Sequence, residues 1–130
     1  MSFTHTLKTI FSSTGSASVQ GSVATVADAE DNRDITVPPS TSNFAVALTL
    51  AFASLKSLFI LSDLDVLLET NSGSAPDDTI NLKAGVPFTW VASGGAANPF
   101  DTNITSLFLT NLHATLAATV KIRIAQDATP

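Results

Sequence analysis

The chain has 130 residues, enough for one domain with a substantial core but too few for two comfortable ones. Hydrophobic residues make up 45% of the chain and charged residues only 13%, a composition that argues against disorder for most of its length. The net charge of −5, with six scattered basic residues, argues against a nucleic-acid binder, because neutralising phosphates requires clustered Lys and Arg.

The N-terminal residues alternate in a way that is typical of a strand. Phe3, His5, Leu7 and Phe11 share one parity, which predicts a first strand or an extended arm. The next residues, 12–18, are small and polar, and residues 19–26 form a weaker strand candidate. We therefore expect an arm over residues 1–18 and a β-sandwich domain over residues 19–130. The first residues lack a basic region followed by an apolar one, so we expect no secretory signal and synthesis in a cytoplasm.

The densest run of charge lies at residues 28–34, with the sequence DAEDNRD. The pattern predicts a solvated loop, followed by a short strand at residues 35–37 that Pro38 and Pro39 end. Oxygen ligands in this run suggest calcium as an alternative. However, the run lacks the glycine and the distal glutamate of an EF-hand loop.

The central stretch, residues 44–70, organises the rest of the chain. Its first half places Phe44, Val46 and Leu48 on one parity and alanines on the other, which predicts a strand with two apolar faces. Such a strand needs cover on both sides, from the other half of a sandwich or from a symmetry mate. Residues 44–61 are also long enough for a membrane span. The charge of Lys56 and the period of two favour a strand, so we expect no membrane contact.

Further short strands follow at intervals of about ten residues. We expect alternating strand residues from 58 to 68, with a tight turn or a bulge at Ser62-Asp63 between two strands. We also expect strands at residues 79–83, 86–91, 104–112 and 115–125, a hairpin-like turn at Ala84-Gly85, and loops at residues 71–78 and 92–103. In the last strand, Leu116, Ala118, Val120, Ile122 and Ile124 are expected to point inward. The sequence therefore predicts an all-β, single-domain β-sandwich of about eight to ten short antiparallel strands.

A jelly roll is the preferred architecture and an immunoglobulin-like sandwich the second. The segment SLFIL at residues 57–61 recurs as SLFLT at residues 106–110, and Leu67 and Thr70 recur at the same offset as Leu116 and Thr119. A doubled Greek key would place two similar strand pairs in equivalent positions. Coincidence in a chain rich in Leu, Thr and Ser is the alternative explanation.

Residues suited to catalysis are sparse. The absence of cysteine removes disulfides, thiolate metal sites and cysteine nucleophiles. His5 and His113 are the only histidines, no serine lies in a nucleophile-elbow motif, and two histidines alone make a poor zinc site. Asp63 and Asp65 are interpreted as charges that guard a strand edge rather than as a glycosidase pair. We expect no enzymatic activity, no metal and no cofactor.

An aromatic cluster borders the longest loop. Phe88 and Trp90 end a strand, and Asn98 and Phe100 follow a Gly-Gly pair. Aromatic residues beside a glycine-rich loop are typical of protein-contact hot spots or of sugar-stacking platforms. The alternative is that Trp90 and Phe100 cap the open end of the core.

From Leu55 to Asp127 the order of these segments resembles that of small structural proteins of tailed bacteriophages. The residues that carry the resemblance are Glu69-Thr70-Asn71-Ser72, Leu82-Lys83-Ala84-Gly85 with Pro87 and Trp90, and Asn98-Pro99-Phe100. Members of that class are head-decoration or other minor capsid-associated β-sandwiches, and they have no catalytic residues to transfer to this chain.

The resemblance implies a non-enzymatic virion structural protein. It would be a homo-oligomer, preferably a trimer, made in the host cytoplasm and attached to the major capsid protein as a decoration or cement protein. The residues we expect to contact partners are Phe3, Leu7, Phe11, Trp90, Asn98 and Phe100. The competing hypothesis is a carbohydrate-binding β-sandwich module with Trp90 and Phe100 as stacking residues, and a small hydrolase comes third.

Overall fold

The structure, a computed structural model, describes residues 2–127 as ten β-strands and two short 3-10 helices. The strands are β1 (Phe3–Ser13), β2 (Ser16–Ala27), β3 (Ala29–Val37), β4 (Thr41–Leu50), β5 (Leu55–Ser62), β6 (Val66–Thr70), β7 (Thr79–Leu82), β8 (Phe88–Val91), β9 (Ile104–Asn111) and β10 (Ala118–Gln126). The helices are η1 (Phe52–Ser54) and η2 (Ala92–Gly94). Every strand pairing is antiparallel, so the expected all-β class and strand count are confirmed.

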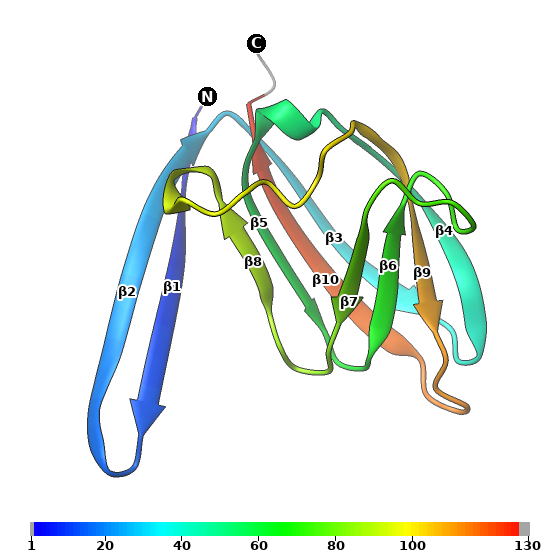
Figure 1. Ribbon diagram of the computed structural model, residues 1–130, viewed down its shortest axis with the longest axis horizontal. Helices are drawn as coiled ribbons and strands as arrows, with labels where there is room; N and C mark the ends of the chain where they lie inside the picture. Colours follow the sequence, from blue (N-terminus) through cyan, green and yellow to red (C-terminus); the bar gives the residue numbers. More distant parts are fainter. Residues whose placement is uncertain (1, 128–130) are drawn as a thin grey trace.

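Eight of the strands form the body of the molecule as two four-stranded sheets (Figure 1). One sheet has the strand order β3-β10-β5-β8 and the other has the order β4-β9-β6-β7. Of the body strands that follow one another in the chain, only β6 and β7 pair with each other. Every other connection in the body passes from one sheet to the other, which places the two sheets face to face.

A single hydrophobic core fills the space between the sheets. Period-two alternation builds it, since β10 buries Ala118, Val120, Ile122 and Ile124 as predicted and directs the intervening side chains outward. The recurring segments do the same in both sheets. β5 buries Leu58 and Ile60, and β9 buries Leu107 and Leu109.

The first two strands form a separate two-stranded sheet, which we call the arm (residues 3–27). The arm is connected to the body through Asp28 and extends beside the sandwich with its tip far from the core (Figure 1). The weak strand candidate at residues 19–26 is therefore the partner of the first strand. The expected division at residue 18 falls within β2.

The charge run at residues 28–34 is not a loop, as predicted, but enters β3, which pairs with β10 from Ala29 to Val37. The charges tolerate a strand because this is the edge of the sheet, where charged side chains are common. They also find partners: Arg33 bonds Asp31, and Arg123 on β10 lies 2.9 Å from Asp34.

Two local predictions near the turns are also wrong. The strands around Ala84-Gly85 do not pair as a hairpin, because β7 pairs with β6 while β8 pairs with β5 in the other sheet. Gly85 adopts a φ of +74° in a turn closed by Val86 N–H donating to the oxygen of Lys83. Leu116 is 54% exposed rather than inward, because β10 begins only at Ala118.

The large side chains of β4 face the core and its alanine-lined side is exposed. Leu48 and Leu50 are buried, whereas Ala45, Ala47 and Thr49 lie open to solvent. The opposite sheet therefore covers only one face of this edge strand. Among the described residues there is no helix long and apolar enough to cross a membrane.

Candidate functional site

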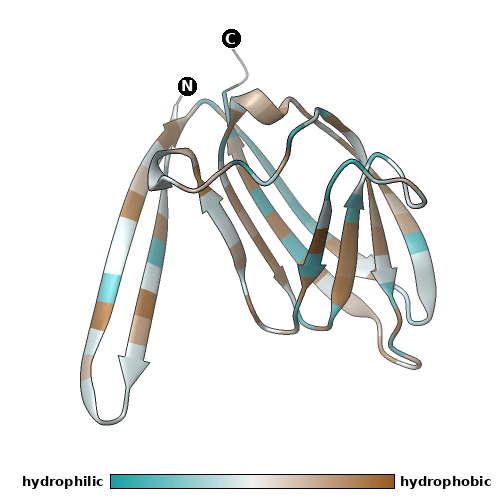
Figure 2. Ribbon diagram, viewed as in Figure 1, coloured by the Kyte–Doolittle hydropathy of each residue, from teal (hydrophilic) through white to brown (hydrophobic). Residues whose placement is uncertain are grey.

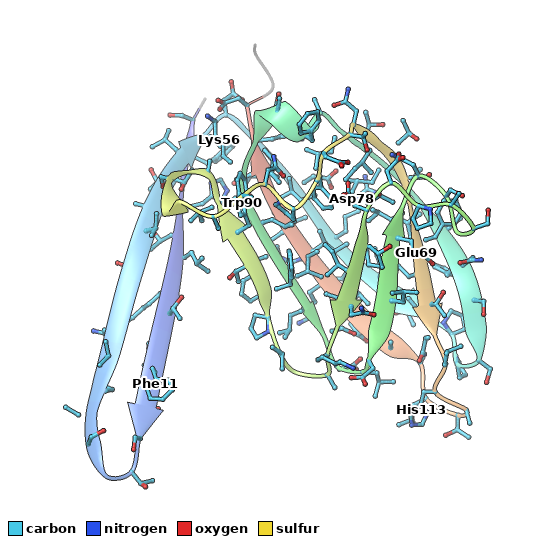
Figure 3. All side chains as sticks on the ribbon, viewed as in Figure 1. Phe11, Lys56, Glu69, Asp78, Trp90 and His113 are labelled. Atoms are coloured by element: carbon cyan, nitrogen blue, oxygen red, sulfur yellow. The ribbon has the colours of Figure 1, made fainter. Side chains whose placement is uncertain are left out.

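Among the described residues, the arm carries five of the eight large hydrophobic side chains that are exposed. Phe11, near its tip, is 75% exposed, and Phe3 at its base is 37% exposed, while Leu7 is half-buried (Figure 3). Hydrophobic residues recur at intervals along both arm strands (Figure 2). Three of the predicted contact residues therefore lie on one protruding element.

The register of the arm separates its two faces. Phe3, Leu7 and Phe11 lie opposite Ala27, Val23 and Val19, so these residues share one face with His5, Thr9, Gly21 and Thr25. The reverse face is mostly polar, with Thr4, Thr6, Lys8, Gln20 and Ser22, although it also carries Ile10, Ala24 and Val26. We call the first of these the apolar face of the arm.

The base of the arm leans over the outer face of the β3-β10-β5-β8 sheet. His5 Nε2 lies 3.5 Å from Glu30 Oε1 on β3, and Ala27 is buried. Between the arm and this sheet lies a hollow of about 390 Å³. Its lining residues are Thr4, His5, Thr6, Leu7, Asn32, Ser57, Leu58, Phe59, Val91, Arg123, Ile124 and Ala125.

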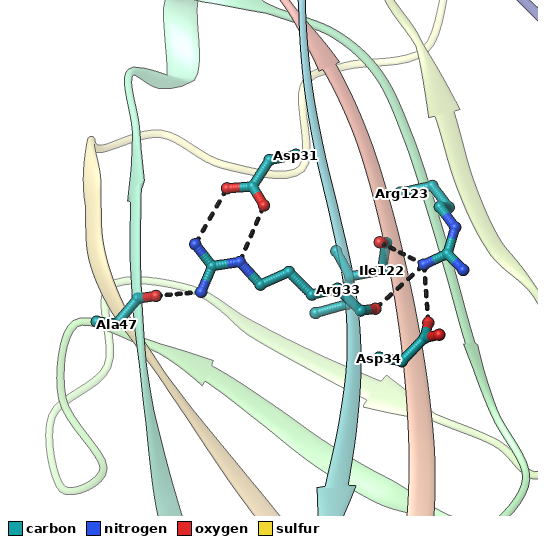
Figure 4. A network of polar contacts seen from close by, with 6 residues as sticks. All are labelled: Asp31, Arg33, Asp34, Ala47, Ile122 and Arg123. Atoms are coloured by element: carbon teal, nitrogen blue, oxygen red, sulfur yellow. Dashed lines mark hydrogen bonds and ion pairs between the residues drawn. The ribbon is translucent and has the colours of Figure 1, made fainter.

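The guanidinium of Arg123 is the charged group in the wall of this hollow. Its Nη1 lies 2.9 Å from Asp34 Oδ1 and donates to the backbone oxygens of Arg33 and Ile122 (Figure 4). The carboxylate of Asp34 on β3 therefore balances the positive charge of Arg123, and these contacts keep the guanidinium beside β3. The rest of the wall is mixed, with five polar residues beside apolar ones, and the apolar lining residues are Leu7, Leu58, Phe59, Val91, Ile124 and Ala125. These give an apolar occupant a surface to pack on.

The aromatic loop is part of the body rather than an open platform. Phe100 is only 4% exposed and belongs to the core, and Trp90 packs against that core with its Nε1–H donating to the oxygen of Ala96 at 3.0 Å. Asn98 fastens the loop, since its amide donates to the oxygen of Phe52 and its Oδ1 accepts from Phe100 N–H. This placement is compatible with the capping alternative for Trp90 and Phe100, and Phe100 exposes only 4% of its surface to any partner.

The other polar groups singled out in the sequence have structural partners. His113 Nδ1 accepts hydrogen bonds from the backbone of Thr115 and Leu116, which shapes the β9–β10 turn. Asp63 accepts from Thr119 N–H, and Asp65 accepts from Ala84 N–H. Within residues 2–127, no group of three or more His, Asp or Glu side chains is arranged to hold a metal ion.

Comparison with protein-family models, with curated proteins and with solved structures finds no match to this chain.

Sequence reasoning named both strands of the arm but missed their pairing. Val19 and Val23 complete the apolar face, and Val19 is 69% exposed. The signal was present, because residues 12–18 have turn composition between two segments of matching parity. An alternating stretch before that turn could therefore have been paired with the one after it.

Proposed function

We propose that this chain is a non-enzymatic virion structural protein of a bacteriophage, a decoration or cement protein that acts as a homo-oligomer on the capsid lattice. The arm is the observation that carries the proposal. A two-stranded hairpin is at best marginally stable alone in water, and this one exposes Phe11 and Val19 on one face. An element of this kind gains its stability from a neighbouring subunit.

The finer architecture that we propose is a jelly roll. If each strand from β3 to β6 is matched to the strand four places later, the order β3-β10-β5-β8 becomes β7-β6-β9-β4, which is the other sheet. This internal symmetry supports a doubled Greek key. The recurring segments fit it, since residues 57–61 lie on β5 and residues 106–110 lie on its counterpart, β9.

The surface composition also supports an assembly role. The alanine-lined face of β4 and the exposed Val86, Leu112 and Leu116 leave apolar area uncovered on the body. Repeated weak contacts on a lattice add up to tight attachment through effective concentration. A low-charge subunit with several small apolar areas is suited to such multivalent binding.

The test is the protein content of gradient-purified phage particles from the phage that encodes this chain, measured by quantitative mass spectrometry against the major capsid protein. We expect a fixed, stoichiometric ratio that persists through a second gradient. Absence of the chain from intact particles, or a ratio that falls with each purification step, contradicts the proposal.

The carbohydrate-binding alternative has its own test, which is a glycan array with the purified chain and the Trp90→Ala variant. Burial of Phe100 and the engaged indole of Trp90 leave no paired stacking platform, so we expect no specific glycan signal. A glycan bound by the wild-type chain and lost in the variant would favour the module.

A further inference from the structure

The apolar face of the arm continues beyond the part that its own body covers. His5, Leu7, Val23 and Thr25 are half-buried against the body. Farther out on the same face, Thr9, Phe11, Val19 and Gly21 are exposed. The pairs Leu7/Val23 and Phe11/Val19 therefore repeat outward along the face, separated by Thr9 and Gly21, but only the basal half of the face has a partner within the chain.

The contact between the arm base and its own sheet is incomplete. The hollow of about 390 Å³ separates them, and two buried polar atoms of facing residues, His5 Nδ1 and Thr25 Oγ1, lack hydrogen-bond partners. A cavity of ~150 Å³ is enough to bind benzene, so this hollow has room for a phenyl ring and a valine side chain together.

We propose that the arm tip of one copy, with Phe11 and Val19, inserts into the hollow between the arm base and the outer sheet face of a second copy. The hollow has the walls that such an occupant needs, since Leu7, Phe59 and Val91 supply apolar surface. The basal half of the same apolar face already packs on this sheet. The outer sheet face of a second copy therefore offers the arm tip the same kind of apolar surface on which the arm base packs within its own chain. This inference rests on the self-association in the proposed function and names the surfaces that carry it.

The dimensions of the arm fit this exchange. β1 has 11 residues, so the arm is about 36 Å long, and its apolar face covers about 350 Å² of a two-stranded sheet. If the outer half of each arm is seated, each tip-to-hollow contact buries about 350 Å² of total surface, well below the ~1,000 Å² of a stable two-body interface. A single contact is therefore weak, and closure of a ring, in which each copy makes two such contacts, is what holds the copies together. Tip-to-hollow contacts are heterologous, because each contact joins two different surfaces of the chain. Such contacts form a closed ring when the rotation from one copy to the next returns to the first copy, and a filament when it does not.

The first experiment measures the mass of the purified full chain by light scattering over a concentration series. We expect a closed oligomer, and we expect Phe11→Ser to raise its dissociation constant by about 30-fold, which corresponds to the exposure of one buried aromatic side chain. The matched control is Ile10→Ser. Ile10 is the neighbouring residue on the reverse face and is 55% exposed, so its replacement should leave the dissociation constant unchanged. Far-UV circular dichroism checks that both variants keep the strand content.

The second experiment locates the contact. The chain has no cysteine, so a Thr9→Cys chain can be mixed with a Ser57→Cys chain of different tag length, and the mixed disulfide is distinguished from the two homodimers by its size. Thr9 lies on the same face as Phe11 and is exposed, so Phe11 and Val19 stay in place. We expect a mixed disulfide under mild oxidation from Thr9→Cys and Ser57→Cys, and none from Ser57→Cys and Lys8→Cys, whose cysteine lies on the reverse face. Equal yields from the two mixtures would overturn the assignment of the hollow.

A strictly monomeric chain at all concentrations would also overturn the inference, even if the protein co-purifies with particles and its arm is needed for that attachment. The arm would then dock on the capsid protein, and the proposed function would stand. Conversely, the chain could form an oligomer that Phe11→Ser disrupts and yet be absent from phage particles. That result would support the insertion of the arm tip into a second copy and refute the virion role.

Discussion

The side-chain amide of Asn111 donates a hydrogen bond of 3.1 Å to the backbone oxygen of Val37, which joins the end of β9 to the end of β3. The same amide also reaches the oxygens of Pro38 and Leu116, while its Oδ1 accepts from His113 N–H. Asn111 is fully buried. Its side chain provides hydrogen-bond partners for backbone groups at the ends of β3 and β9, which lie in different sheets and do not pair with each other. This residue ties both sheets to the β9–β10 turn.

Replacement of Asn111 should therefore be costly. Asn111→Ala leaves one buried and three part-buried backbone groups without this partner, and we expect the free energy of unfolding to fall by about 3 kcal/mol. Urea denaturation measures this, with Asn81→Ala on the exposed side of β7 as the control. A loss below about 1 kcal/mol would show that water replaces the amide.

Arg33 closes the open side of the sandwich between the edge strands β3 and β4. Its guanidinium makes two hydrogen bonds to Asp31, of 2.9 and 3.2 Å, and a third to the oxygen of Ala47 on β4 (Figure 4). The hydrogen bond to Asp31 raises the pKa of Arg33.

We expect Arg33→Ala to lower the free energy of unfolding by about 1 kcal/mol, because the pair is partly exposed and only its geometry is favourable. Arg33→Lys should recover less than half of the loss, since an ammonium cannot form the two-pronged contact. Chemical denaturation of the wild-type chain, Arg33→Ala and Arg33→Lys measures the three free energies of unfolding. Full recovery by lysine would show that charge alone is sufficient.

Phe100 belongs to the core, and its truncation tests that placement. The side chain is 4% exposed and packs in the main cluster, so Phe100→Ala should cost about 3–5 kcal/mol. Val86→Ala, at a position 58% exposed, should change stability by less than about 0.5 kcal/mol. Similar small effects for both substitutions in urea unfolding would place Phe100 on the surface.

Asp78 gives the stability a dependence on pH. Burial raises its pKa above the ordinary 3.8, and the charges of Asp101 and Asp77 add to this, while a hydrogen bond from Asp101 N–H opposes it. At pH values between 3.8 and the raised pKa, Asp78 is therefore mostly protonated in the folded chain and mostly ionised in the unfolded chain. The stability contributed by protonated Asp78 is present at low pH and is lost as pH rises from 3.8 through the folded pKa.

Asp78→Asn cannot ionise, and its side-chain oxygen still accepts from Asp101 N–H. Its stability relative to wild type should therefore increase as pH rises above 3.8 and then level off. Unfolding free energies of both proteins from about pH 3 to about pH 7 provide the measurement. Parallel curves over this range would contradict the shift.

Much of the fold could be predicted from local pattern, because period-two alternation is written in neighbouring residues. The inward set of β10 from Ala118 to Ile124 and the end of β3 at Val37 before two prolines needed no tertiary information. The turn at Gly85 was also located correctly, but its consequence was not. Whether the strands on either side of a turn pair with each other depends on partners that lie far away in the sequence.

The candidate site depended still more on distant partners. Phe100 and Phe11 are both aromatic residues followed by polar ones along the chain, yet one is buried in the core and the other protrudes. No local signal separates them, since burial is decided by what the rest of the chain places nearby.

By itself the sequence determined that the chain is all-β, because alternation sets which side chains share a face of each strand. Only the tertiary structure decided which of those faces are covered. Strand order and the departure of residues 3–27 from the body are set by packing between distant segments, and that packing left one apolar face of the arm half-covered.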